Sequence, residues 1–137
     1  MLATELDPAT ALAISVIRRA LAGEVTELVP KVLRHYDATP HRCHDNVAAW
    51  VKLYPKHKQV FGFLVANERE IDTSLVIPHC VVEDTDGTLC DITPGESVYR
   101  YPFVRHVGSL AEFELIAGKE PFMVEIPNEL LRRLGVM

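Results

Sequence analysis

The chain of 137 residues contains no apolar run long enough to cross a lipid bilayer, which takes about 20 consecutive residues. Its first residues, MLATELDPATALAIS, include Glu5 and Asp7 and lack the basic start of a secretory signal. Repeats, low-complexity segments and an interdomain linker are also absent from the sequence. We therefore expect one globular domain over residues 1–137, in the cytoplasm and without a membrane partner.

Paired cysteines are missing as well. The three cysteines, Cys43, Cys80 and Cys90, are odd in number and none forms a C-x-x-C pair, so no disulfide framework is predicted. Each is either a small buried hydrophobe or a reactive thiol. A zinc site is disfavoured, because adjacent residues such as Cys43 and His44, or His79 and Cys80, cannot both point at one ion from regular structure. We expect no metal and no cofactor.

Clustered basic residues are lacking too. Lys and Arg number 14 against 19 Asp and Glu, and the formal net charge is −5 at neutral pH. The basic residues are scattered along the chain. Binding to nucleic-acid phosphates needs a concentrated positive surface, so the composition argues against a nucleic-acid partner.

The first part of the chain carries helix signals. Asp7-Pro8 combines an N-cap residue with a proline suited to the first helical position, and predicts a helix that ends at Gly23. A second short helix is predicted over about residues 25–34. Thr39-Pro40 repeats the start signal and predicts a third helix, with Cys43 in its first turn.

Strand signals dominate after Pro55. Strands are predicted over 60–65, 74–83, 88–92, 101–107 and 122–126. Ser109 and Glu112 form a capping-box pattern that opens a further helix, which Gly118 closes, and a last helix is predicted over 127–134. The order indicates an α+β fold, in which N-terminal helices pack on a mostly antiparallel β-sheet.

Cys43 is the candidate nucleophile. A thiol is mostly protonated at neutral pH and is then a poor nucleophile. A helix N-terminus together with a nearby imidazole favours the thiolate. The free N–H groups of the same helix start can hold an oxyanion, to which Asn46 adds a side-chain donor, while His44 lines the site. His79, at the head of a predicted strand, is the candidate base, and Asp91 on the next strand is the residue that orients it.

The turn between these strands decides whether His79 and Asp91 share a face. A two-residue loop at Asp86-Gly87 would turn Asp91 away from His79. A three-residue loop, Thr85-Asp86-Gly87, makes them diagonal neighbours on one face, and Gly87 suits the left-handed position that such a loop ends on. The sequence therefore predicts the second register. The opposite face then holds the apolar residues Cys80, Val82, Cys90 and Ile92, which assigns two cysteines to the core.

These residues resemble a known family. A cysteine that opens a helix, a histidine on a later strand and the segment HCVVEDTDGTLCDITP are similar to the papain-like and transglutaminase-like superfamily, over the stretch from Cys43 to Pro94. The resemblance implies a papain-like or transglutaminase-like core and a Cys-His-Asp triad carried by Cys43, His79 and Asp91, acting through a thioester without a cofactor.

The chain also departs from that pattern. Papain-type proteases place a Gln before the cysteine, whereas the only Gln here, Gln59, follows it, so backbone N–H groups are left to hold the oxyanion. Val81 stands where transglutaminases usually carry a Trp after the histidine. The specific reaction therefore stays open.

The sequence predicts a thiol-dependent hydrolase or acyltransferase, of the peptidase, amidase or deamidase type. Its partner would be a peptide, a protein or a small amide-containing substrate. Neither the substrate nor the oligomeric state is indicated, and hydrolysis is not separated from acyl transfer. The main alternative is a catalytically inactive binding module on the same fold. A zinc-binding protein is the less favoured one.

Overall fold

The computed structural model describes residues 6–30, 43–93, 101–118 and 123–137. The elements in chain order are α1 (Pro8–Leu21), β1 (Val29–Pro30), α2 (Cys43–Leu53), β2 (Lys58–Glu68), the 3-10 helix η2 (Arg69–Ile71), β3 (Thr73–Glu83), β4 (Leu89–Asp91), β5 (Phe103–Arg105), α3 (Leu110–Ala117), β6 (Val124–Pro127) and α4 (Asn128–Arg133). None of the helices in this part of the chain is long and apolar enough to span a membrane.

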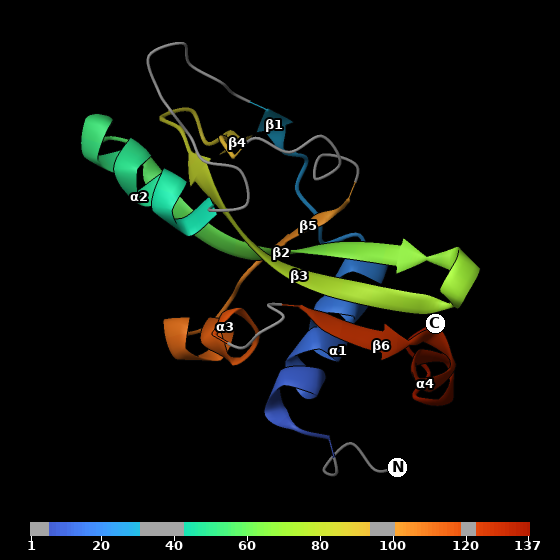
Figure 1. Cartoon of the computed structure of the whole chain (residues 1–137). Helices are drawn as coiled ribbons and strands as arrows, with labels where there is room; N and C mark the ends of the chain where they lie inside the picture. Colours follow the sequence, from blue (N-terminus) through green and yellow to red (C-terminus); the bar gives the residue numbers. More distant parts are fainter. Residues whose placement is uncertain (1–5, 31–42, 94–100, 119–122) are drawn as a thin grey trace.

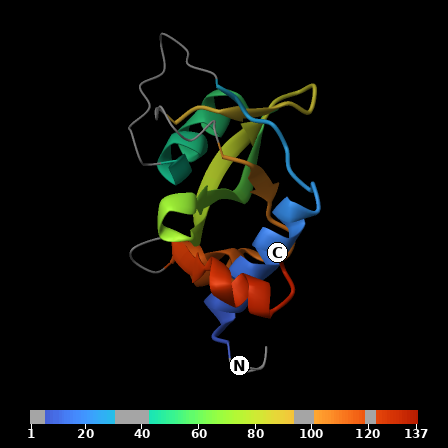
Figure 2. The ribbon, with the colours of Figure 1, turned by 90° about the vertical axis from the view of Figure 1, so that its right-hand side faces the viewer.

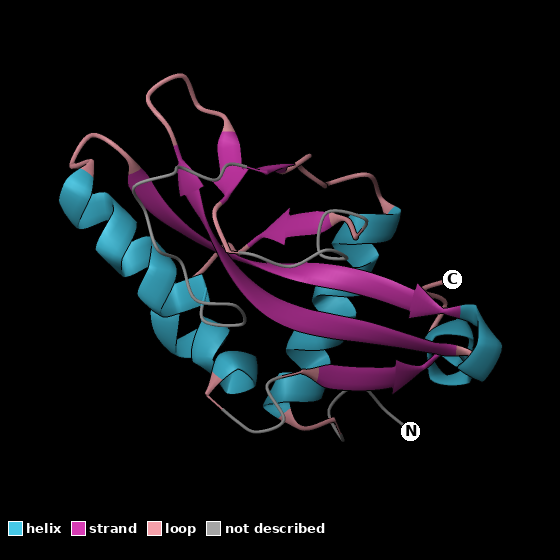
Figure 3. Ribbon diagram, turned by 45° about the horizontal axis from the view of Figure 1, so that its top comes forward, coloured by secondary structure: helices cyan, strands magenta, loops and turns pink. Residues whose placement is uncertain are grey.

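The sheet is built on the long β2–β3 hairpin (Figure 1). β5 pairs with β2, while β4 and β6 both pair with β3, at opposite ends of that strand. All these pairings are antiparallel, and only β1 runs parallel to its neighbour β4. The predicted α+β fold with a mostly antiparallel sheet is therefore confirmed at this level, and the sheet is open (Figure 3).

The two faces of the hairpin are covered differently. Side chains alternate between the faces of a strand, and one face packs against the helices. Its first apolar cluster joins α1 and α3 to Phe63 and Val76, and its second joins α2 to Cys80 and Val82. The other face packs against Leu28 and other residues outside the hairpin. Figure 2 shows the segment after α1 running to the end of the sheet that holds β4.

Several predicted elements are confirmed. The Asp7 side chain accepts the backbone N–H of Thr10 at 2.9 Å, and α1 starts at Pro8. Ser109 caps α3 by accepting from the Glu112 N–H. α2 begins at Cys43, as the sequence predicts, while the Thr39-Pro40 start signal lies outside the described residues.

The predicted helix over residues 25–34 is wrong where the structure describes it. Thr26 forms an antiparallel bridge with Phe103, and Val29–Pro30 is the strand β1 beside Cys90. The β-branched Val25, Thr26 and Val29 favour extended backbone, and Pro30 has no N–H to donate within a helix. Residues 31–34 lie outside the described part.

Candidate active site

The β3–β4 hairpin has the register that the sequence predicts. Val82 lies opposite Cys90 and Glu83 opposite Leu89. Asp84 then donates its N–H to the Thr88 carbonyl at 3.0 Å, which leaves three residues in the loop. The last of these, Gly87, has a φ of 89°, a conformation that residues with a Cβ rarely adopt. This turn fixes which side chains of the two strands face each other.

His79 and Asp91 meet as a result. The distance from His79 Nε2 to Asp91 Oδ2 is 2.7 Å, and the two side chains are 6% and 0% exposed. The other carboxylate oxygen, Oδ1, accepts the backbone N–H of Thr93 at 3.1 Å. Asp91 is thus both an Asx-turn residue and the partner of His79. With Nε2 occupied, Nδ1 is the nitrogen left for another group.

Cys43 approaches this pair from α2. It is the first residue of the helix, is half-buried, and packs against the cluster that contains Trp50 and Cys80. The N-terminal end of α2 points towards the middle of the β2–β3 hairpin (Figure 1). β4 and β6 leave the outer edge of β3 unpaired between Ile77 and Val81 in the described chain. The Cys43 side chain lies near enough to His79 to help raise the pKa of its imidazole.

The surroundings of His79 favour the charged ring. Burial by itself disfavours the imidazolium, but the hydrogen bonds and charges of Asp91 and Cys43 outweigh it and raise the pKa of His79 from 6.5 to about 9. His79 is therefore an imidazolium at neutral pH. In that state it can stabilise a thiolate on Cys43 and later donate a proton to a leaving group.

Asn46 occupies a different position from the free donor that the sequence suggests. Its side chain is buried, and its Nδ2 donates to the Thr93 hydroxyl at 3.1 Å. Because the Thr93 N–H holds Asp91, this bond connects α2 through Thr93 and Asp91 to His79. The Thr93 hydroxyl was not recognised in the sequence, because its role depends on α2 lying against the end of β4.

The other two cysteines are core residues, as predicted. Cys80 is fully buried and Cys90 is 3% exposed. Burial raises the pKa of the Cys80 thiol to about 12, which keeps it protonated and unreactive. Gln59 donates to Cys80 Sγ at 3.3 Å. Of the three thiols, only Cys43 is partly accessible, and it lies near the His79 imidazole.

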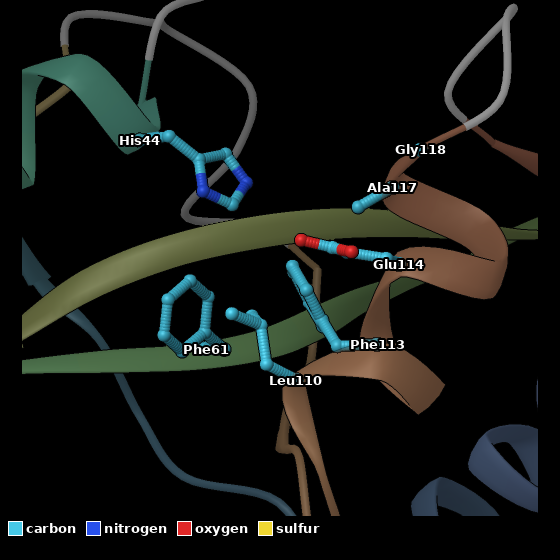
Figure 4. Close-up of a pocket in the computed structure, with 7 residues that line it drawn as sticks. All are labelled: His44, Phe61, Leu110, Phe113, Glu114, Ala117 and Gly118. Carbon is cyan, nitrogen blue, oxygen red and sulfur yellow. The ribbon is translucent and has the colours of Figure 1, made fainter.

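His44 lies beside the nucleophile position and turns its ring towards α3 (Figure 4). The ring centroid is 5.6 Å from that of Phe61 and 5.7 Å from that of Phe113. This packing removes water from one side of the imidazole, and burial lowers the pKa of His44. His44 is thus neutral at neutral pH, in contrast to His79.

A metal centre finds no support in this part of the chain. Within residues 6–30, 43–93, 101–118 and 123–137, no three His, Cys, Asp or Glu side chains are grouped so that they could hold an ion. The paired side chains at the site, His79 and Asp91, are bonded to each other.

Comparison of the chain with protein families, with curated proteins and with solved structures finds no match.

Proposed function

We propose that the protein is a thiol-dependent hydrolase or acyltransferase that acts on an amide or related acyl bond through a thioester on Cys43. One observation carries the proposal: Asp91 holds His79 at 2.7 Å, and the thiol that opens α2 lies near enough to the same ring to raise its pKa. A nucleophile, its base and an orienting carboxylate in this order form the arrangement that activates a weak nucleophile.

The reaction would begin from a pair of Cys43 thiolate and His79 imidazolium, in which the thiol proton already lies on Nδ1 of His79. The thiolate attacks the substrate carbonyl carbon, and the N–H groups at the start of α2 stabilise the oxyanion. The His79 imidazolium then protonates the leaving nitrogen, the C–N bond breaks, and the acyl group stays on sulfur. Water or an amine attacks the thioester, and His79 accepts its proton. Asp91 remains ionised throughout and holds the ring.

The arrangement also supports a place in the papain-like or transglutaminase-like superfamily as part of the proposal. In the resemblance given above, the cysteine opens a helix, the histidine lies on a later strand and, in the transglutaminase branch, an Asp follows after a short turn. Here these positions are the first residue of α2, the middle of β3 and the end of β4. The order of these elements and the register of the hairpin support the proposed fold family.

The test is to trap the acyl-enzyme. The protein is mixed with a p-nitrophenyl ester, release of p-nitrophenolate is followed by absorbance, and the acylated residue is located by peptide mass spectrometry. We expect acylation of Cys43, none in Cys43→Ser, and a rate at least about 100-fold lower in His79→Ala. Cys90→Ser, which changes a buried thiol that precedes Asp91 on β4 and has no part in the proposed chemistry, is the matched control and should still be acylated at Cys43.

Two results would contradict the proposal. One is acylation of Cys43 at an unchanged rate in His79→Ala, since the imidazole would then have no part in the reaction. The other is no acylation of Cys43 in folded wild-type protein, which would favour a binding module without catalysis.

A further inference from the structure

A hollow of about 340 Å³ lies between the start of α2 and α3, over β2 (Figure 4). Its volume is at the lower end of the range for small-molecule sites, which suits one long side chain better than a large ligand. The residues that form most of its lining are His44, Phe61, Leu110, Phe113, Glu114 and Ala117.

The hollow adjoins the proposed nucleophile. His44, which forms one wall, directly follows Cys43 in α2. Phe61, which forms the floor, also packs against the apolar cluster that Cys43 contacts. In addition, His44 lies close enough to His79 for the two rings to interact electrostatically. A substrate whose carbonyl lies at Cys43 would therefore have its neighbouring side chain beside this hollow.

The lining combines aromatic rings with a single carboxylate. The ring centroids of Phe61 and Phe113 are 5.0 Å apart, and the His44 ring lies near both. Glu114 supplies the acidic group, and Figure 4 shows its carboxylate at the hollow, on the side facing His44. Among the described residues that line the hollow there is no Lys or Arg, and His44 is neutral at neutral pH because burial lowers its pKa. Glu114 is therefore the one charged side chain in the described lining.

We propose that this hollow is the specificity pocket of the enzyme and that it takes an apolar side chain ending in a cation, such as that of lysine or arginine, from the acyl part of the substrate. The methylene groups of such a chain would lie against Phe61 and Leu110. Its cationic end would meet the aromatic faces and the Glu114 carboxylate. An anionic side chain would be repelled, and a purely apolar one would leave Glu114 without a partner for its charge. The inference rests on the proposed function, since it assigns the substrate class of that same site.

Affinity labels with a common reactive group test the pocket. Tosyl-lysyl and tosyl-phenylalanyl chloromethyl ketones alkylate a thiol after their side chain has bound. Iodoacetamide, which has no side chain, reports the reactivity of the thiol alone. We expect the lysyl reagent to label Cys43 about tenfold faster than the phenylalanyl reagent, while the iodoacetamide rate shows whether a variant has changed the thiol itself. In Glu114→Gln this ratio should fall by about fivefold.

The matched control is Glu125→Gln, which removes the same charge from an exposed position on β6. It should keep the wild-type ratio. Glu114→Lys should invert the preference, so that a glutamyl chloromethyl ketone labels Cys43 faster than the lysyl one. Circular dichroism of each variant checks that α3 is still folded.

The outcomes separate the two proposals. An unchanged ratio in Glu114→Gln, with iodoacetamide labelling of Cys43 that still depends on His79, overturns the pocket and leaves the proposed function standing. Labelling of Cys43 that is independent of His79 overturns the proposed function, and the specificity pocket falls with it. If the lysyl preference is lost in Glu125→Gln as well as in Glu114→Gln, the preference comes from the overall charge of the protein. That result would overturn the proposed specificity pocket.

Discussion

At the scale of single residues, the His79 ring has partners on both sides. Asp91 holds Nε2 at 2.7 Å, and Cys43 lies near enough to raise the pKa of the same imidazole. A buried carboxylate without its cationic partner is costly, so the His79–Asp91 pair links the chemistry of the site to the stability of the fold. This link makes stability depend on pH in a defined direction.

The first prediction concerns that dependence. The pKa of His79 is raised from 6.5 to about 9 in the folded state, so the folded protein keeps a proton that the unfolded chain loses in this range. The stabilisation is complete below pH 6.5, decreases as pH rises, and is lost above about 9. Urea unfolding of the wild type and His79→Gln across this range should show their difference in free energy shrinking by on the order of 3 kcal/mol. A difference that is constant or grows with pH would contradict the raised pKa.

At the scale of elements, the close approach of β5 to β2 depends on Gly62. This residue lies opposite His79 in the hairpin and opposite Arg105 in β5. A Cβ at Gly62 would lie 2.3 Å from Cζ of Phe103 and 2.6 Å from the Val104 carbonyl oxygen. Because one of these contacts is backbone, a side-chain rotation alone cannot relieve the clash.

The second prediction is that Gly62→Ala lowers the free energy of unfolding by about 2–3 kcal/mol, through overpacking of β5. Gly87→Ala is the control. It has a φ of 89° but nothing within 4 Å of the added Cβ, so only backbone strain applies and a loss of about 1 kcal/mol is expected. Urea denaturation measures both variants. Equal losses in the two would show that crowding at Gly62 is not significant.

The elements differ in how far the sequence alone predicts them. Asp7 and Ser109 bond to the backbone within their own first helical turns, and Gly87 acts within its own turn, so local signals sufficed. Val29–Pro30 is different, because it becomes a strand only by pairing with β4, some sixty residues later in the chain. The local propensities of these residues cannot predict a pairing partner so far away in the sequence.

At the scale of the whole molecule, the two ends of the β2–β3 hairpin have different surroundings. One end holds the proposed site together with α2 and β4. At the other end, the buried Asn128 of α4 accepts the Ser74 hydroxyl at 2.6 Å and donates to Asp72 Oδ1 at 3.0 Å. Figure 1 shows α2 and α4 at opposite ends of the hairpin.

The third prediction compares the two ends. Thr93→Val removes the acceptor of Asn46, and Asn128→Ala removes the partner of Ser74, so each should lower the free energy of unfolding by about 1–3 kcal/mol. Only Thr93→Val loosens α2 at the site, and it should slow alkylation of Cys43 severalfold while Asn128→Ala leaves the rate unchanged. Equal effects of both variants on the rate would mean that general destabilisation, and not the position of α2, controls the thiol.

The candidate site could be predicted from the sequence only where local patterns determine it. Cys43 at a helix start, and His79 and Asp91 on one hairpin, follow from local patterns and turn geometry. The hollow beside them was not predictable, because it forms only where α3 packs near α2, and no spacing in the sequence marks Glu114 as its acidic residue. Long-range packing places these residues together.

The most direct test of the account is the rate at which iodoacetamide alkylates each cysteine of the native protein near neutral pH, followed by peptide mapping. We predict that Cys43 reacts at least about tenfold faster than Cys80 and Cys90, and that His79→Ala slows Cys43 by about tenfold or more while the two buried thiols are unaffected. If Cys43 reacts no faster than the buried cysteines, or equally fast without His79, the imidazole does not activate the thiol and the central claim is wrong.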